Sequence, residues 1–292
     1  MARAGGRLRL AAAVSALGLL GTPRGAAPQA PAPAPTPPRP PGAGIAIGDL
    51  AWADGSLERA ELPQKSSWRR LSPGDKLRTG DTFRTSDEAT VRLDFPWMVV
   101  GLGPSTMLTI PASTVLSTVL EQGRAEFAGP GRDIVKISVG DGEVRGGGRL
   151  VLRRSVGRTS ASVLEGSFRL RAAGRTVEVK AGEGAVVTDG RPPEAPAPLP
   201  PPPRGLQPGK DPVYVRSGQP VDLRWTAAGP SHHVEVLDLQ KDEVLLAREA
   251  TGPPLRLEIP WLGTYRWRVS ARDARGLESR PSAEGLICSV DR

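Results

Sequence analysis

Apolar and polar residues alternate one by one along most of the chain. In the segment ATVRLDF, the apolar side chains fall on one face of an extended backbone: Ala89, Val91, Leu93 and Phe95. A period of two is typical of a strand that is buried on one side. No window keeps apolar residues at helical spacing over three turns, so the pattern predicts an all-β protein.

Turn signals rich in glycine separate these alternating segments. They are SPGD at 72–75, TGD at 79–81, EQG at 121–123, GDG at 140–142, GGG at 146–148, EG at 165–166 and AGEG at 181–184. Glycine adopts the positive φ that tight turns require without steric cost. Short strands with frequent turns predict a sandwich, a barrel or a stacked, twisted sheet for residues 44–190.

A second set of strands follows a proline-rich stretch at 191–211, which is predicted to be a linker between two domains. The strands expected within 212–292 are PVDLRW, HHVEVLD, EVLLAREA, LRLEI, TYRWRVSARD and EGLICSV. Their number and spacing predict a small β-sandwich. In TYRWRVSARD, Tyr265, Trp267 and Val269 share one face and are expected in its core.

The beginning of the chain has the layout of a secretory signal peptide, predicted to span residues 1–27. A basic segment, MARAGGRLR, precedes an apolar run of 12 residues and a short stretch of small residues. Residues 28–43 are rich in alternating proline and predict an extended linker. We therefore expect a bacterial protein that is periplasmic, secreted or at the cell surface. Because the apolar run is too short to span a bilayer, no membrane-spanning segment is expected after cleavage.

The net charge of +8 is concentrated in the first 43 residues, which carry five arginines and no acidic residue. The remaining excess is small and is distributed over both predicted domains. Binding to nucleic acid requires basic residues gathered on a folded face. The charge distribution therefore argues against a nucleic-acid partner.

The segment LSPGDKLRTGDTFRTSDEATVRLDF resembles the opening of a FecR-type domain, with its paired G-D turns and alternating strand. VLEQGRAEF and the stretch from VKISVGDGEV to AGEGAVVTDG resemble the rest of that family, over most of 68–190. The likeness departs at DFPWMVVGLGPSTMLTI, where the family's D-G-S turn is absent. The best-known members are membrane-spanning regulators that relay a signal to a sigma factor, and they need a spanning helix that we do not expect here. The resemblance thus implies a periplasmic or surface binding module.

The run LGTYRWRVSARDARGLESRPSAEG resembles bacterial fibronectin-III-like modules, which often read G-x-Y-x-W-R-V followed by D-x-x-G. This likeness implies a fibronectin-III-like sandwich for residues 212–292.

Residues that carry chemistry are few, so we expect no enzyme, no catalytic residue, no cofactor and no metal. His232 and His233 are adjacent and therefore point to opposite faces of a strand, where they cannot share an ion. Cys288 is the single cysteine, which excludes an internal disulfide and predicts a small core residue near the last strand. No phosphate-binding or nucleophile-elbow motif is present.

One cluster of basic residues is a candidate binding patch for an anionic glycan or a phosphate. It consists of Arg149, Arg153, Arg154 and Arg158. The alternative is a solvated strand surface with no ligand.

The sequence as a whole favours a non-enzymatic exported envelope protein whose FecR-like domain is an interaction or sensing module. The expected partner is an envelope protein or a cell-wall glycan, and the sandwich is a spacer or a second contact. The alternatives are a purely structural scaffold of an envelope assembly, or a partner in trans-envelope signalling to a sigma-factor regulator.

Overall fold

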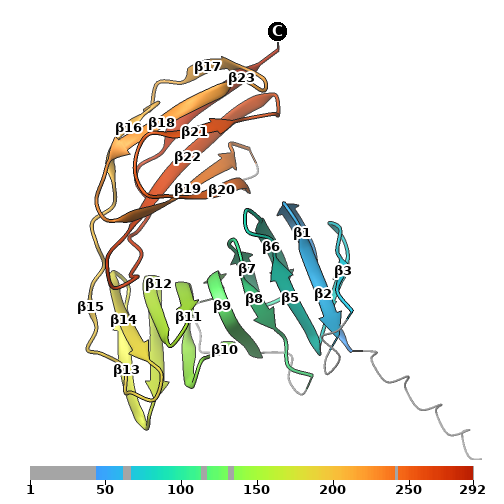
Figure 1. Ribbon diagram of the computed structural model, residues 1–292, viewed down its shortest axis with the longest axis vertical. Coiled ribbons are helices and arrows are strands. Elements are labelled where there is room, and N and C mark those ends of the chain that lie inside the picture. Colours follow the sequence, from blue (N-terminus) through green and yellow to red (C-terminus); the bar gives the residue numbers. More distant parts are fainter. Residues whose placement is uncertain (1–43, 62–66, 113–116, 131–134, 241–242, 292) are drawn as a thin grey trace, which may run out of the picture. The chain divides into compact units, whose positions relative to one another are not determined.

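The structure, a computed structural model, describes residues 44–61, 67–112, 117–130, 135–240 and 243–291. These residues form 23 strands and no helix, which confirms the all-β prediction (Figure 1). No stretch within those ranges is a candidate for a membrane-spanning helix. The predicted signal peptide (1–27) and the first proline-rich linker (28–43) lie outside the described residues.

Fifteen strands form one hydrogen-bonded sheet, which we call the first sheet. They are β1 (Ala46–Asp54), β2 (Leu57–Glu61), β3 (Arg69–Arg70), β4 (Lys76–Arg78), β5 (Asp81–Thr85), β6 (Thr90–Phe95), β7 (Met98–Leu102), β8 (Met107–Thr109), β9 (Ser117–Ala128), β10 (Val135–Val139), β11 (Gly142–Ser155), β12 (Arg158–Ala172), β13 (Arg175–Lys180), β14 (Glu183–Thr188) and β15 (Ala197–Pro198). Its main path is β15-β14-β12-β11-β10-β9-β7-β6-β1-β4, and the other strands pair alongside.

Three long strands fold this sheet into two layers. The second half of β9 pairs with β7, whereas its first half pairs with β8 and β10. Likewise β11 pairs with β10 through its first half and with β9 through its second. β12 pairs with β14 through its first half and with β13 through its second. The hydrophobic core lies between the layers and joins side chains such as Phe83 of β5 to Leu93 of β6 and Val100 of β7. Burial of each such side chain contributes about 1.5–3 kcal/mol.

Glycines make the bends in these long strands. Gly148 of β11 faces Gly166 of β12 across the ladder, and their φ angles are +118° and +74°. A Cβ atom on Gly148 would lie 2.2 Å from the carbonyl oxygen of Glu165. Only glycine fits there, because both the backbone conformation and the space exclude a side chain.

Three of the predicted turns are wrong for this reason. The glycines at 121–123, 146–148 and 165–166 lie inside β9, β11 and β12. Positive φ bends these strands between layers and does not reverse the chain. The other four glycine signals are turns, as predicted, at 72–75, 79–81, 140–142 and 181–184.

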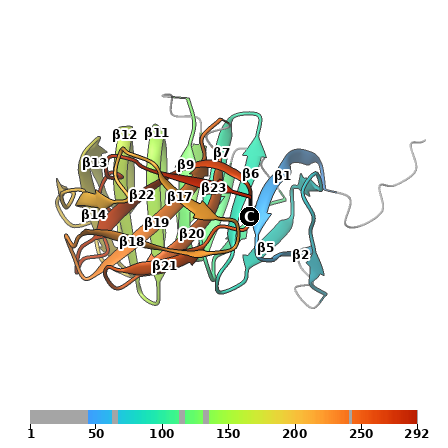
Figure 2. The ribbon, with the colours of Figure 1, turned by 90° about the horizontal axis from the view of Figure 1, so that it is seen from above.

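The remaining eight strands form two packed sheets, which we call the sandwich. They are β16 (Arg204–Gln207), β17 (Val213–Arg216), β18 (Pro220–Thr226), β19 (Ser231–Asp238), β20 (Val244–Ala250), β21 (Leu255–Glu258), β22 (Gly263–Arg272) and β23 (Gly285–Val290). One sheet has the order β16-β18-β21 and the other β17-β23-β22-β19-β20. All six strands predicted beyond residue 212 are present. Seen from above, the strands of the sandwich run across those of the first sheet (Figure 2).

The sandwich has its own hydrophobic core, centred on two tryptophans. Trp267 is completely buried, as predicted, and its ring centroid lies 6.3 Å from that of Trp225. The indole Nε1 of Trp267 donates a hydrogen bond to the carbonyl oxygen of Pro208 at 3.0 Å. Cys288 was expected in this core, and that expectation is wrong. It is half-buried on the opposite face of β23, because Ile287 takes the inward position.

The stretch predicted as a linker, 191–211, contributes strands to both parts of the chain. β15 pairs with β14 of the first sheet, and β16 pairs with β18 of the sandwich. The two hydrophobic cores have no residue in common. The division into domains at this stretch stays a prediction.

Candidate ligand-binding site

The sandwich meets the outer face of the first sheet along strand β20. The hydroxyl of Thr90 in β6 donates to the carbonyl oxygen of Ala247 at 3.5 Å. Arg248 Nη1 lies 3.3 Å from Asp54 Oδ2 of β1. Beside these contacts the two parts enclose a cavity of about 320 Å³.

The floor of the cavity follows from strand alternation. In β7, Met98, Val100 and Leu102 point into the core, so Val99 and Gly101 face the sandwich. Lining residues from the first sheet include Trp52, Arg92, Val99, Gly101, Arg124, Glu126 and Arg149, and those from the sandwich include His233, Glu235, Leu237, Val244 and Arg268. The site therefore combines apolar walls with charged groups of both signs.

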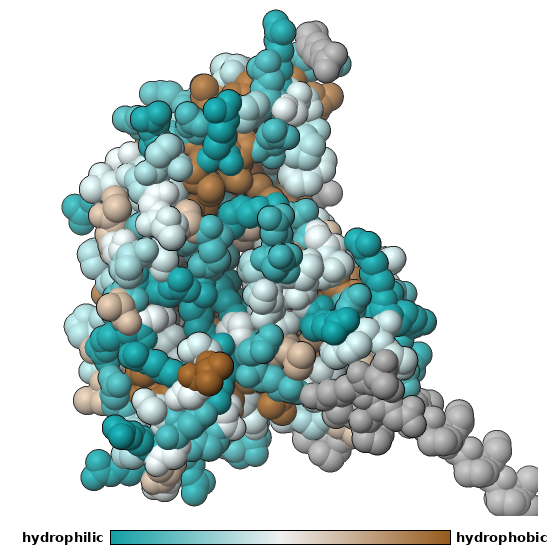
Figure 3. Space-filling model, in the orientation of Figure 1, coloured by the Kyte–Doolittle hydropathy of each residue, from teal (hydrophilic) through white to brown (hydrophobic). Residues whose placement is uncertain are grey.

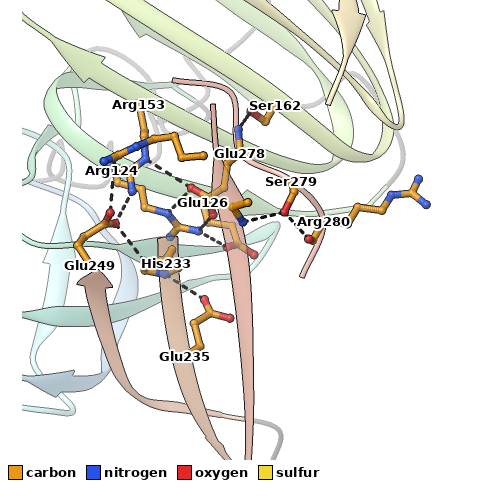
Figure 4. Close-up of polar contacts among 12 residues, drawn as sticks. Arg124, Glu126, Arg153, Ser162, His233, Glu235, Glu249, Glu278, Ser279 and Arg280 are labelled. Atoms are coloured by element: carbon orange, nitrogen blue, oxygen red, sulfur yellow. Dashed lines mark hydrogen bonds and ion pairs between the residues drawn. The ribbon is translucent and has the colours of Figure 1, made fainter. Parts of the chain in front are cut away.

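Arg124 and Glu278 form the most buried ion pair between the two parts (Figure 4). Arg124 of β9 is 6% exposed, and Glu278, in the segment between β22 and β23, is 2% exposed. Arg124 donates through Nε and Nη2 to the two carboxylate oxygens of Glu278, at 3.0 and 2.7 Å. The backbone N–H of Glu278 donates to Ser162 Oγ at 2.8 Å. Removing one partner of such a pair leaves a buried charge uncompensated, which costs about 3–5 kcal/mol.

His233 continues this network on the sandwich side. Its Nε2 lies 3.3 Å from Glu235 Oε1, and its Nδ1 lies 3.1 Å from Glu249 Oε1. Glu249 of β20 also receives a contact from Arg153 of β11. Figure 4 shows these side chains converging between the strands of the two parts. We call Arg124, Arg153, His233, Glu235, Glu249 and Glu278 the interface cluster.

The electrostatics of the interface cluster favour the charged forms of Glu278, His233 and Glu249. Burial raises the pKa of Glu278, but Arg124 outweighs burial and lowers that pKa to about 2. Burial and Arg124 lower the pKa of His233, yet hydrogen bonds to Glu235 and Glu249 raise it above its ordinary value. The pKa of Glu249 is lowered, because burial is outweighed by His233 and Arg153. Each of these ionised groups is thus held by partners of opposite charge.

Two further ion pairs flank the cavity. Arg149 Nε donates to Glu126 Oε1 at 2.6 Å on the floor. Arg268 Nε donates to Glu235 Oε2 at 2.6 Å on the sandwich side. These pairs fix charged groups beside the apolar walls of the cavity, and polar groups that are held in place set the orientation of a ligand.

The cavity and the interface cluster offer a ligand fixed donors and acceptors beside apolar surface. The carboxylates of the interface cluster accept from arginine or histidine, so their proton affinity is low. Among the described residues, no group of three His, Cys, Asp or Glu side chains is placed to hold a metal ion. His232 lies on the other face of β19, where its ring packs edge-on against Trp225 at a centroid distance of 5.3 Å. The two histidines therefore point apart, as predicted.

The four arginines singled out from the sequence divide between two places. Arg149 lines the cavity and binds Glu126, while Arg153 belongs to the interface cluster. Arg154 forms a two-pronged ion pair with Asp189, at 2.7 and 2.6 Å. Arg158 lies with Arg153 and Arg154 beside a second cavity, at the end of the β11–β12 hairpin.

Sequence reasoning missed most of the interface cluster. Glu278 and Arg124 are 154 residues apart in the chain, and neither belongs to a recognisable motif. One signal was present in HHVEVLD, where the polar residues His233 and Glu235 lie on the same face of a strand that is otherwise mostly apolar. Buried charges of this kind require partners, but the sequence does not identify them.

Comparisons with known proteins give a partial likeness. No protein-family model matches the chain, and no curated protein matches it. Two crystal structures, both described as a "putative anti-sigma factor" from Parabacteroides distasonis, are similar to part of it. One is 13% identical with a TM-score of 0.36, and the other is 15% identical with a TM-score of 0.35. Each match covers 40% of this chain and spans 59% of the length of the solved chain.

Proposed function

We propose that the protein is a non-enzymatic, exported bacterial envelope protein that binds an envelope partner in the cavity between the first sheet and the sandwich. The observation that carries this proposal is the composition of the cavity walls, which come from β6, β7 and β9 below and from β19, β20 and β22 above. A partner seated there contacts both parts. It therefore stabilises one arrangement of them over others, which is what a sensing module requires.

The chemistry of the cavity supports a partner that is partly apolar and partly charged. Val99, Leu237 and Val244 offer apolar contact, while Arg92, Arg149 and Arg268 offer donors. An extended segment of an envelope protein or a cell-wall glycan has both kinds of group. In this proposal the first sheet is the FecR-like module, and the sandwich, fibronectin-III-like by its sequence, is the second contact.

A second function, that of a fixed scaffold, is favoured by the buried pair Arg124–Glu278. A two-pronged pair with so little exposure holds the two parts in one arrangement. A scaffold needs no ligand in the cavity, so occupation of the cavity separates the two functions.

The test uses a photo-crosslinking amino acid at Val99, on the cavity floor, in the full chain in its own cell envelope. Thr176, exposed on β13 and away from the cavity, is the control position. We expect a discrete adduct, or retention on cell-wall glycan, from position 99 and not from position 176.

A second variant fills the cavity without disturbing the sheet. A Cβ on Gly101 would lie 3.8 Å from the Cβ of Glu126, an ordinary contact, so Gly101→Leu is accommodated and projects into the cavity. Gly101→Leu should abolish the adduct, and Thr176→Leu should leave it unchanged. Equal crosslinking from both positions, or an adduct that survives Gly101→Leu, would contradict binding in the cavity and favour the scaffold.

A further inference from the structure

A second cavity, also of about 320 Å³, lies at the end of the β11–β12 hairpin. The first sheet contributes Arg153, Arg154 and Arg158 to its lining, and the sandwich contributes Arg272 and Arg275. No acidic residue is part of the lining. Five guanidinium groups that surround one space from β11, β12, β22 and the loop after β22 concentrate positive charge in it.

The carboxylates near this cavity are already engaged. Asp189 binds Arg154 with both oxygens, and Glu194 binds Arg275 at 3.0 Å. The Glu249 carboxylate forms ion pairs with Arg153, Arg272 and His233. Burial lowers the pKa of Arg272, and the nearby Arg153 guanidinium lowers it further. Positive charge is therefore in excess at this point.

Arg158 has a buried donor that makes no hydrogen bond within the part of the chain that the structure describes. Its Nε is buried and has no hydrogen-bond partner among the described residues. A buried donor without a partner is unfavourable, and an anionic ligand that accepts from it removes this cost. The cavity has ample room, since one water needs only roughly 10–15 Å³.

We propose that this arginine-lined cavity, which we call the hairpin site, binds a phosphate group. Guanidinium groups that approach from several elements suit a tetrahedral anion, which presents oxygens in all directions, better than a planar carboxylate. The site lies apart from the cavity of the proposed function and does not depend on it. Because the walls come from the first sheet and the sandwich, a bound phosphate links the two parts.

The test measures binding of inorganic pyrophosphate to the purified full chain by calorimetry at physiological salt. We expect one saturable site, a melting temperature that rises with pyrophosphate, and no comparable binding of acetate. Arg158→Gln should weaken binding at least tenfold. The matched control is Arg175→Gln, because Arg175 occupies the same position in the next hairpin, opposite Ala172, and should bind as the parent does.

Two outcomes overturn the hairpin site. One is the absence of saturable binding, and the other is equal weakening by Arg158→Gln and Arg175→Gln. Acetate binding as strong as that of pyrophosphate overturns the phosphate assignment. Arg275→Gln tests the contribution of the sandwich to the site and should also weaken pyrophosphate binding.

A vesicle-binding experiment distinguishes the two possible sources of the phosphate. Val156, at the tip of the same hairpin, is fully exposed, so a lipid surface is one source and a soluble phosphorylated compound is the other. Retention on vesicles containing phosphatidic acid, absent with phosphatidylcholine alone and competed by pyrophosphate, assigns a lipid headgroup. Pyrophosphate binding without vesicle retention assigns a soluble ligand.

Discussion

His233 is a titrating residue whose charge ties the sandwich's own strands together next to the cavity. Each of its ring nitrogens faces a carboxylate, Glu235 on the same strand and Glu249 on the neighbouring strand. Arg124 and Arg153 also lie in this cluster, where Glu278 pairs with Arg124 and Glu249 contacts Arg153. The doubly protonated ring satisfies both carboxylates, whereas the neutral ring donates to only one.

The pH dependence of stability should therefore carry the signature of His233. Its pKa in the folded protein is raised, so its contribution is complete below the unfolded value of about 6.5 and is lost as pH rises through the folded value. A hydrogen bond to a charged group contributes about 1.5–3 kcal/mol. We expect His233→Gln to lower the free energy of unfolding by about that amount near pH 6 and by less above pH 8.

Urea denaturation of the parent and of His233→Gln, from pH 6 to above pH 8, measures the difference in their free energies of unfolding. His232 is present in both and cancels in the comparison. A difference that stays constant, or that grows with rising pH, would show that His233 is neutral in the fold.

Individual residues of the site were the least predictable part of the molecule. The basic character of 149–158 was visible in the sequence, and the structure places Arg153, Arg154 and Arg158 around one cavity. Arg272 and Arg275, which complete that cavity, come from the end of β22 and the loop after it, more than one hundred residues later. Partners separated so far along the chain are set by how the two parts pack, and no local pattern encodes that.

Single strands, by contrast, were predicted correctly from the alternation of apolar and polar residues. All four apolar residues of 89–95 are buried, and every strand predicted in the sandwich is present. Alternation is a local consequence of a half-buried strand, so it survives in the sequence. What it could not distinguish was a glycine at a turn from a glycine at a bend inside a long strand, because both need positive φ.

Gly148 offers a test of the bend in β11. Gly148→Ala places a Cβ atom against the backbone carbonyl of Glu165, and neither backbone can move freely inside a paired ladder. Gly174→Ala is the control, because its φ is +75° and nothing lies within 4 Å of the new Cβ. Both variants carry the cost of positive φ, about 1–2 kcal/mol.

We expect Gly148→Ala to lose stability beyond the control by a further 1–3 kcal/mol or so, the cost of local strain. Thermal unfolding of the two variants beside the parent measures this. Equal melting temperatures for the two variants would mean that the strand pair relaxes around the added methyl group.

At the scale of the whole molecule, two hydrophobic cores meet across a polar contact. The core of the first sheet and the core of the sandwich share no residue, and the ion pairs of the interface cluster join the parts. Charged and polar residues cover most of the face seen in Figure 3. Polar contacts between parts of a chain resemble those of transient complexes, and parts joined in this way unfold separately more readily than a shared core does.

Trp267→Ala tests whether the sandwich can unfold while the first sheet stays folded. The residue is completely buried between the two sheets of the sandwich, and truncating a buried tryptophan costs about 3–5 kcal/mol. The total free energy of unfolding of a domain is about 5–15 kcal/mol. The substitution therefore removes a large part of the stability of the sandwich and touches no residue of the first sheet's core. We expect faster amide hydrogen exchange throughout β18–β23, with protection kept in β6, β7 and β10.

Trp261→Ala is the matched control, since Trp261 lies in the same part of the chain but is 38% exposed. Its ring contacts Tyr265 at a centroid distance of 6.4 Å, and losing one such aromatic pair costs no more than about 1.5 kcal/mol. Exchange in this variant should match the parent within both cores.

If Trp267→Ala instead exposes β6, β7 and β10 as much as β18–β23, the two cores form one cooperative unit. The interface cluster would then be the reason, because unfolding the sandwich removes Glu278 and Glu249 and leaves Arg124 without its buried partner.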